Sequence, residues 1–242
     1  MKKAVKLQLQ FLKKEKKAKD TYSFYFVRAQ NNFDFKPGQY LRINLDIGNP
    51  DERGSSRYFT ISSSPTDQEF LTITTRIIRS SFKLKLNSLK SGDMVRAFGP
   101  LGYFNLDIKS RRPKIFLAGG MGVTPYHSII RYLDKKKISV EVTLIASFSI
   151  KKEAVFYDEL KKIESQNPAV RVIYTLTKDN NLYPKFVNGR IDEKMIKKYV
   201  QDYKRGDFFI VGPQTFETAM LELVKGIGIS EENIFTENFP GY

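Results

Sequence analysis

The sequence predicts two domains in succession, a small antiparallel β-barrel and a doubly wound α/β domain built on a parallel sheet. Up to about residue 108, short runs alternate apolar and polar residues, which is the pattern of half-buried strands. After the hinge-like segment Ser110-Arg111-Arg112-Pro113, strand-like runs alternate with helix-like segments, as they do in βαβ units. We therefore expect one domain over residues 1–110 and a second over residues 111–242.

In the first domain, four runs carry the strand pattern, and glycine- and proline-containing turns separate them. The alternating positions are Val5, Leu7, Leu9 and Phe11; Tyr22, Phe24 and Phe26; Leu41, Ile43 and Leu45; and Leu71, Ile73, Thr75 and Ile77. Short strands of this kind favour a small barrel. A short helix is expected at Phe82–Leu89.

In the second domain, strands and helices are expected in strict alternation, which right-handed connections turn into a parallel sheet. The expected strands are Lys114–Ala118, Ser139–Ala146, Arg171–Leu176, Asp207–Val211 and Asn233–Glu237. The expected helices are Thr124–Lys136, Glu153–Glu164, Asp192–Tyr199 and Thr215–Lys225.

The composition is that of a soluble globular protein, with 41% hydrophobic and 28% charged residues among 242. No apolar run approaches the ~20 residues of a membrane span. The basic N-terminus alternates apolar and polar residues, unlike the continuous apolar core of a signal peptide. We expect a cytoplasmic protein.

The absence of cysteine excludes Cys-ligated iron–sulfur clusters, disulfides, thiol catalysis and Cys-containing zinc sites within these residues. The single histidine, His127, is too few for a bis-His haem or a multi-His metal site, so no metal is expected. Its place in a predicted helix favours a packing or surface role. If the chain is an enzyme, a bound organic cofactor is expected to carry its chemistry.

The formal net charge is +15. Most of its lysine runs are typical of solvated faces or hairpin loops. The summed field still attracts anions, such as an acidic protein, a phosphorylated cofactor, nucleic acid or an anionic membrane. Charge alone does not choose among them.

Two segments carry chemistry. In Phe116–Pro125, an apolar run leads into Gly119-Gly120-Met121-Gly122 and then a predicted helix; flexible glycines and free N–H groups at a helix start suit a pyrophosphate. A tight strand-to-helix turn alone would explain the same residues. In Ser56–Pro65, Arg57 precedes an aromatic residue and a hydroxyl, which suits a phosphate beside a flat ring. An ordinary strand remains a competing explanation there.

Together with other motifs, these segments resemble the ferredoxin–NADP reductase superfamily of flavoproteins. The family's order is F-x-P-G-Q-Y, R-x-[YF]-[ST], a Ser-rich phosphate turn, G-D, G-P-x-G, G-G-x-G-x-T-P, G-P and a terminal E-x-F. Here these are Phe35–Tyr40, Arg57–Thr60, Ser80–Phe82, Gly92-Asp93, Gly99–Gly102, Gly119–Pro125, Gly212-Pro213 and Glu237–Phe239. The motifs span nearly the whole chain in the family's order, which chance rarely produces.

The resemblance implies a six-stranded barrel that binds FAD. Arg57 would bind its phosphates, Phe59 would stack on the isoalloxazine, and Thr60 would hydrogen-bond near N5. Ser80 and Ser81 would contact the pyrophosphate. The full set of expected FAD-binding residues is Arg57, Tyr58, Phe59, Thr60, Ser62, Thr74, Thr75, Ser80, Ser81, Phe82, Phe239 and Tyr242.

The resemblance also implies that the second domain binds NAD(P)H at the glycine turn, with Gly212-Pro213 letting the nicotinamide approach the flavin. The expected residues are Gly119, Gly120, Gly122, Val123, Thr124, Pro125, Ser147, Gly212 and Pro213. Thr60 and Glu237 are the expected catalytic residues. Tyr242 either covers the flavin or is a frayed end.

Four departures from the family pattern matter. Phe59 stands where Tyr is usual, Ser80 where the phosphate turn often begins with Gly, and Val211 where many members have Cys. After the strand ending at Ala146, no arginine is present to hold the 2′-phosphate of NADP, although serines and lysines follow. The choice between NADH and NADPH stays open.

By resemblance, the expected reaction is hydride transfer from NAD(P)H to FAD, followed by release of single electrons. The chain has neither iron–sulfur ligands nor the histidines for haem, so we expect a separate acceptor. The positive charge favours an acidic ferredoxin or flavodoxin; free flavin, ferric chelates or a quinone remain possible acceptors.

Two other functions compete with the reductase. A regulatory or electron-transfer subunit of a larger complex would bind FAD and dinucleotide mainly to control its partner. A basic nucleic-acid-binding protein would fit a barrel with interspersed aromatic residues. The scattered lysines and the unexplained glycine turns argue against nucleic acid.

Overall fold

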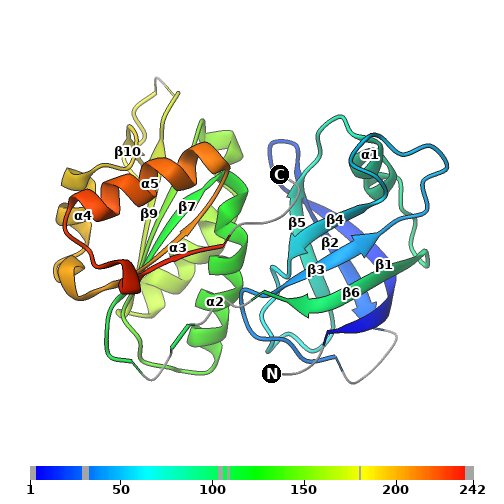
Figure 1. Cartoon of the computed structure of the whole chain (residues 1–242), viewed down its shortest axis with the longest axis horizontal. Coiled ribbons are helices and arrows are strands. Elements are labelled where there is room, and N and C mark those ends of the chain that lie inside the picture. Colours follow the sequence, from blue (N-terminus) through cyan, green and yellow to red (C-terminus); the bar gives the residue numbers. More distant parts are fainter. Residues whose placement is uncertain (1–3, 29–32, 103–105, 108–109, 180, 238–242) are drawn as a thin grey trace.

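The computed structural model describes residues 4–28, 33–102, 106–107, 110–179 and 181–237. Their strands form two six-stranded sheets, which lie side by side with one helix, α2 (Val123–Lys135), between them (Figure 1). All pairings are antiparallel in the first sheet and parallel in the second. The predicted fold class is confirmed.

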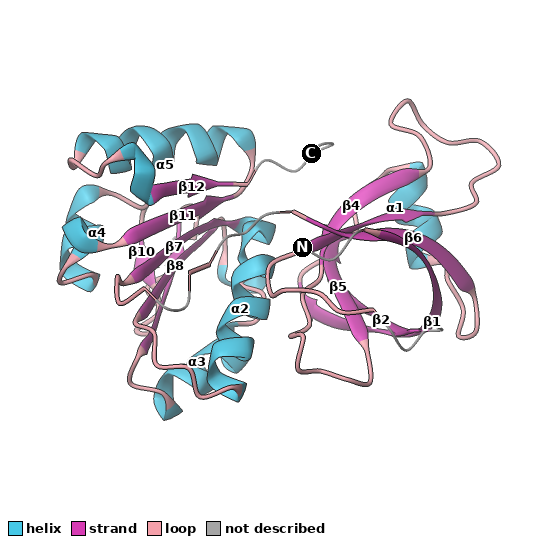
Figure 2. Ribbon diagram, turned by 60° about the horizontal axis from the view of Figure 1, so that its bottom comes forward, coloured by secondary structure: helices cyan, strands magenta, loops and turns pink. Residues whose placement is uncertain are grey.

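The first sheet is a barrel whose strand order is β4-β3-β6-β1-β2-β5. A bridge between Ile61 and Ile73 links its two ends, and Figure 2 looks into the resulting ring. A short helix, α1 (Ser81–Asn87), joins the fifth and sixth strands. The strands are β1 (Val5–Ala18), β2 (Thr21–Arg28), β3 (Tyr40–Asn44), β4 (Ser56–Thr60), β5 (Leu71–Arg76) and β6 (Met94–Leu101).

The second sheet has the order β10-β9-β8-β7-β11-β12. The chain therefore moves outward from β7 in one direction and then returns to its other side, which places a topological switch point at β7. The strands are β7 (Lys114–Gly119), β8 (Val142–Phe148), β9 (Val170–Leu176), β10 (Val187–Asn188), β11 (Asp207–Val211) and β12 (Ile234–Thr236).

Helices cover both faces of this sheet (Figure 2). One core packs α2 and α3 (Tyr157–Gln166) against one face. The other core packs α4 (Glu193–Tyr199) and α5 (Gln214–Gly226) against the opposite face. Burial on both faces explains why β7 and β11 read as continuous apolar runs.

Several element bounds differ from the predictions. The strand expected at Ser139–Ala146 is β8, Val142–Phe148. The helix expected from Glu153 begins only at Tyr157, because Phe156 has φ = 63° and interrupts helical geometry after a 3₁₀ turn at 151–153. Strands β6 and β10 were not predicted, and β4 lies in the segment for which an ordinary strand was one of two explanations.

The two domains meet where α2 packs on the barrel segment 62–67. The Ser128 hydroxyl donates to the Ser63 carbonyl oxygen at 2.6 Å, and His127 Nδ1 lies 2.8 Å from the Ser62 carbonyl oxygen. Arg131 pairs with Asp67 at 2.8 Å. His127 is buried and is therefore a packing residue of this junction.

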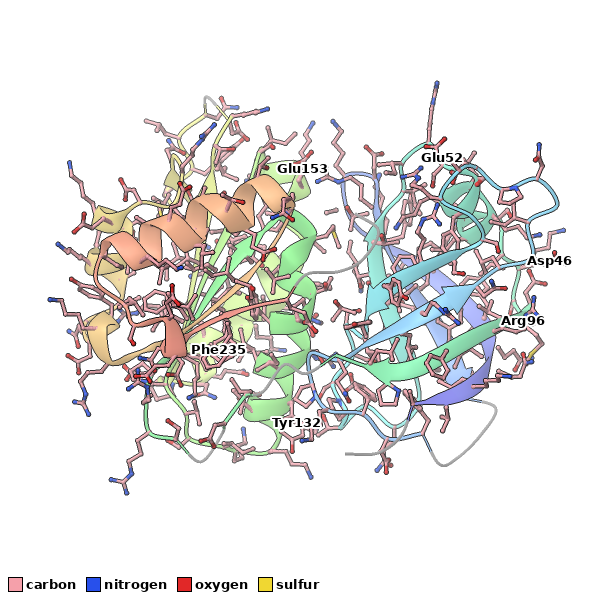
Figure 3. The ribbon with its side chains drawn as sticks, in the orientation of Figure 1. Asp46, Glu52, Arg96, Tyr132, Glu153 and Phe235 are labelled. Atoms are coloured by element: carbon pink, nitrogen blue, oxygen red, sulfur yellow. The ribbon has the colours of Figure 1, made fainter. Side chains whose placement is uncertain are left out.

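A second contact lies at the opposite end of the junction. The Lys19 backbone N–H donates to the Lys152 carbonyl oxygen at 2.7 Å, and Arg76 pairs with Glu153 at 3.2 Å. Figure 3 shows Glu153 at the edge of the α/β domain that faces the barrel. The barrel is thus held at two separated places. Within the described ranges, no helix combines the length and apolarity that crossing a membrane requires.

The first prediction concerns the buried ion pair between β7 and β11. Lys114 is fully buried, and its ammonium lies 2.5 Å from Asp207, which also accepts from Arg112 at 2.6 Å. Asp207→Asn should lower the free energy of unfolding by about 3 kcal/mol, because it leaves a buried cation without its carboxylate. Urea denaturation measures this. The control Glu193→Gln removes an exposed pair with Lys197 and should change stability by less than about 0.5 kcal/mol; equal effects would contradict the assignment.

Candidate functional site

A cavity of about 340 Å³ lies between the two domains. The barrel contributes residues from β4, β5 and the segment leading into α1, and the α/β domain contributes the carboxyl ends of β7 and β11. This is the switch-point edge of the parallel sheet, where doubly wound folds bind ligands. The lining residues are Arg53, Arg57, Tyr58, Phe59, Thr60, Thr75, Arg76, Ile78, Ser80, Lys83, Gly119, Gly120, Met121, Gly122, Thr124, Val211, Gly212, Pro213, Gln214 and Glu217.

Strand β4 supplies most of the barrel wall. Phe59 lines the cavity, although only 3% of it is exposed, and its ring packs on Phe82 in the barrel core with centroids 5.7 Å apart. The neighbouring Thr60 is also buried and lines the cavity. Tyr58 is half-buried and contacts Tyr40 edge to face. An aromatic ring and a hydroxyl therefore border the cavity side by side.

Arg57 lies at the end of the same wall and is already heavily bonded. Its guanidinium donates to the carbonyl oxygens of Arg53, Gly54 and Ser56 at 2.6–3.0 Å. It also donates to the Asp51 carboxylate at 3.0 Å and lies over the Phe82 ring. This arginine is rigidly held, and its charge is balanced within the barrel.

Four of the residues expected to bind FAD do not line the cavity. Ser62 and Thr74 are buried and hydrogen-bond each other at 2.8 Å across neighbouring segments. Ser81 exchanges hydrogen bonds with Asp51, and Phe82 belongs to the barrel core. These side chains hold the wall in shape. Ser80 lines the cavity while its hydroxyl accepts from the Lys83 N–H and caps α1.

The α/β wall is the glycine turn after β7 and the matching turn after β11. Gly119, Gly120, Gly122, Thr124, Gly212 and Pro213 line the cavity, as expected from the sequence. Val123 and Pro125 are buried in α2, and Ser147 lies at the end of β8 outside the lining. The Thr124 hydroxyl donates to the Met121 carbonyl oxygen at 2.9 Å, which fixes the turn.

The glycines serve packing more than the sequence suggested. A Cβ on Gly122 would lie 2.1 Å from the Val211 carbonyl oxygen, and one on Gly119 or Gly212 would meet the Phe216 ring at 2.6 Å. Only Gly120, at φ = 53°, faces open space. The expectation that the glycines let the backbone approach a ligand therefore fits Gly120; Gly119, Gly122 and Gly212 let the turns approach each other and α5.

Glu237, the second expected catalytic residue, follows β12 and touches the barrel outside the cavity lining. Its Oε1 would lie 2.6 Å from a Cβ on Gly102. Both carboxyl oxygens are buried without a hydrogen-bond partner among the described residues. Burial raises the pKa of Glu237 to about 8, so the carboxyl holds a proton at neutral pH. Phe239 and Tyr242 lie outside the described residues.

Sequence reasoning missed several lining residues. Gln214 and Glu217 occupy the first turn of α5, directly after Gly212-Pro213, so the position of that motif at a strand end could have indicated them. Arg53, Arg76, Ile78 and Lys83 belong to no motif that we recognised. Among the described residues, no cluster of three His, Cys, Asp or Glu side chains has the arrangement of a metal site.

Comparison with known proteins gives two family matches in the same order as the domains. The oxidoreductase FAD-binding domain matches residues 8–106, and the oxidoreductase NAD-binding domain matches residues 116–222. The first match contains every element from β2 to β6, and the second contains every element from α2 to β11. The gap between them, residues 107–115, includes the first two residues of β7.

Individual relatives agree with the family matches. The glycine betaine monooxygenase reductase subunit of Chromohalobacter salexigens is 28% identical over 226 residues, which are 91% of this chain and 60% of the relative. A cytochrome P450 reductase from Amycolatopsis aligns with a TM-score of 0.83 and 21% identity, covering 97% of this chain and 70% of that one. A ferredoxin NADP⁺ reductase from Neisseria gonorrhoeae with bound FAD and NADP aligns with a TM-score of 0.81 and 18% identity. That alignment covers 96% of this chain and 98% of the other. The chain spans less than two thirds of the curated relatives, and at these identities the solved structures establish the fold.

A prediction follows from the glycine packing. Gly122→Ala should lower the free energy of unfolding by about 1–3 kcal/mol, because the added methyl group meets backbone atoms that cannot move aside. Gly226, at the end of α5, has open space around its Cβ position, so Gly226→Ala should leave stability unchanged or raise it by about 0.5 kcal/mol. Thermal denaturation of both variants measures the contrast, and a Gly122→Ala protein as stable as the wild type would refute it.

A further prediction concerns Glu237. Since its folded-state pKa is about 8 and the unfolded chain releases this proton near pH 4.5, wild-type stability should fall as pH rises between these values. The glutamine of Glu237→Gln does not titrate. Between pH 5 and pH 9, the free energy of unfolding of this variant should therefore rise by about 1–3 kcal/mol relative to that of the wild type. Chemical denaturation at both pH values tests this. Parallel stability curves would show that the carboxyl is not buried in its neutral form.

Proposed function

Since the chain belongs to the ferredoxin–NADP reductase superfamily, we propose that it is an NAD(P)H-dependent flavoprotein reductase. It would pass electrons from NAD(P)H through FAD to a separate one-electron acceptor, a ferredoxin or flavodoxin. The observation that carries this proposal is a cavity with walls from both domains. One cavity that touches an FAD-binding and an NAD-binding domain supports direct transfer between the two cofactors.

The residues of the cavity suit the cofactor. Phe59 and Thr60 place a ring and a hydroxyl on one wall, where a flat heterocycle needs stacking and a hydrogen bond. Arg53, Arg57 and Lys83 gather positive charge at one end of the barrel wall, as a diphosphate requires. On the opposite wall, Gly120 leaves its surface open. The aromatic surface complements the ring of a flavin dinucleotide, and the cationic surface beside it complements the diphosphate.

When bound, FAD supplies the redox chemistry that side chains lack: it accepts a hydride and gives up electrons singly. The protein's part is alignment. The turn at Gly119–Gly122 and the Gly212-Pro213 turn hold the dinucleotide, and Thr60 orients the flavin by a hydrogen bond. Because α2 continues directly from the glycine turn into the junction with the barrel, both walls keep a fixed separation.

Glu237 is proposed to assist by holding a proton. Its neutral carboxyl is buried beside Gly102 at the edge of the barrel, outside the described cavity lining. A carboxyl that keeps its proton at neutral pH can donate a hydrogen bond without adding negative charge near the cofactors. Thr60 remains the residue proposed to contact the flavin.

The acceptor is proposed to be acidic. The 242 residues contain no cysteine and one histidine, and that histidine is used in the domain junction, so these residues supply no second redox centre. The net charge of +15 attracts an acidic partner and speeds its encounter. Arg53 and Arg76, which line the cavity, are both partly exposed.

A salt titration tests the acceptor. With NAD(P)H in excess, reduction of an acidic ferredoxin or flavodoxin should slow by roughly tenfold between low and 0.5 M salt, because screening removes the attraction. Reduction of a small uncharged quinone by the same protein is the control and should change little. Salt-independent reduction of the acidic protein would rule out this partner class. Reduction of the flavin with no turnover on any acceptor would favour a regulatory subunit.

A further inference from the structure

We propose that Lys83 is the cation that binds the diphosphate of FAD in this protein, and that it makes the site selective for FAD over flavins without a diphosphate. The proposal rests on the FAD site described above. It concerns a residue that the sequence motifs did not indicate, and it follows from how the positive charges around the cavity are paired.

The motif arginine, Arg57, is already paired. Its Nη2 donates to the Asp51 carboxylate at 3.0 Å, and its Nη1 donates to three backbone carbonyl oxygens. Its net attraction for an added anion is therefore reduced.

Asp51 also engages Ser81, which was expected to contact the pyrophosphate, and Arg53, which lines the cavity. Its carboxylate accepts from the Ser81 N–H at 3.1 Å and from the Arg53 N–H at 3.2 Å, and it pairs with the Arg53 guanidinium at 3.3 Å. Burial alone would raise the pKa of Asp51, but the hydrogen bonds from Ser81 and then Arg53 outweigh it and hold the pKa at about 2. Both arginines thus share one permanently ionised carboxylate, which cancels one of their two positive charges.

Lys83 differs from every other cation of the cavity lining. Arg53 and Arg57 pair with Asp51, and Arg76 pairs with Glu153. Lys83 makes no ion pair with any described carboxylate; its ammonium donates to the Thr75 hydroxyl and lies 4.5 Å from the centre of the Phe59 ring. It is half-buried and borders the cavity. A buried ammonium without a counterion is stabilised by an anion placed beside it.

The position of Lys83 also matches the shape of FAD. Because its ammonium lies over the Phe59 ring, a flavin that stacks on that ring must move the ammonium aside, and the phosphates of the same FAD would then serve as its counterion. Riboflavin presents the ring without any phosphate. Lys83 should therefore distinguish FAD from riboflavin, whereas Phe59 and Thr60 would contact both.

The ionisation of Lys83 gives a second readout. Burial, followed by the charges of Arg57 and Arg53, lowers the pKa of Lys83 to about 7. Its hydrogen-bond partner, Thr75, is neutral. Two further charged residues, Arg76 and Glu217, line the same cavity. A phosphate favours the charged ammonium, so FAD binding near pH 7 to 8 should take up a proton, and FAD affinity should fall as pH rises from 6 to 9.

The experiment uses the full chain freed of flavin and measures dissociation constants for FAD and riboflavin by fluorescence at pH 6, 7.5 and 9. Lys83→Gln should weaken FAD binding by about 10- to 100-fold at pH 6 and leave riboflavin binding within about twofold. Lys83→Arg stays charged at every pH and should bind FAD with little pH dependence. Lys85→Gln changes an exposed lysine of the same helix and should behave as the wild type.

The possible results separate the proposal from the proposed function. If Lys83→Gln binds FAD as tightly as the wild type, or loses FAD and riboflavin equally, Lys83 does not bind the diphosphate, while the reductase function stands. If FAD affinity in the wild type does not change with pH, the same conclusion holds. If the wild type itself binds no FAD, the proposed function fails as well.

Discussion

The contact between α2 and the barrel segment 62–67 is the constraint on which the rest of the structure depends. At its N-terminus, α2 emerges from the glycine turn that forms one wall of the cavity. One turn later, Ser128 is fully buried and bonds the Ser63 carbonyl oxygen. The opposite wall, Arg57–Thr60, ends two residues before that segment. A single rigid helix therefore sets the distance between the two walls of the cavity.

The residues around this helix show how the junction is kept rigid. His127 stacks on Phe156 with ring centroids 3.7 Å apart, while its Nε2 lies 3.0 Å from the Glu159 carboxylate. Arg131 joins Glu159 and Asp67 in the same network. Phe156 is the residue with left-handed backbone geometry that delays the start of α3. The irregularity in the second domain thus supports its contact with the first.

Sequence patterns were sufficient for the fold and for much of the cavity. Alternating and continuous apolar runs report directly which face of a strand is buried, so both sheets could be predicted. Strand β4 stayed one of two explanations, because Arg57 occupies an inward-facing position that normally holds an apolar residue. Strand β6 was missed because its end contains the Gly99-Pro100 turn signal. The glycine turn was found correctly, yet the reason for three of its glycines lies in Val211 and Phe216, which are distant in sequence.

The candidate site was harder to predict because charges act through their neighbours. Arg57 fits the family motif, but its pairing with Asp51 becomes visible only when the loop before β4 is folded. Lys83 belongs to no motif and matters because it lacks such a partner. Likewise, Ser62 and Thr74 look like ligand-binding hydroxyls in the sequence, but the barrel turns them toward each other.

The most direct test of the account is the visible absorption spectrum of the protein with FAD, recorded without oxygen before and after addition of NADH or NADPH. If one cavity aligns both cofactors, the protein will bind one FAD per chain, and at least one nucleotide will bleach the flavin absorption within seconds. The nucleotide that bleaches it will also identify the preferred coenzyme. A protein that binds FAD firmly but is bleached by neither nucleotide would contradict the alignment of the two walls.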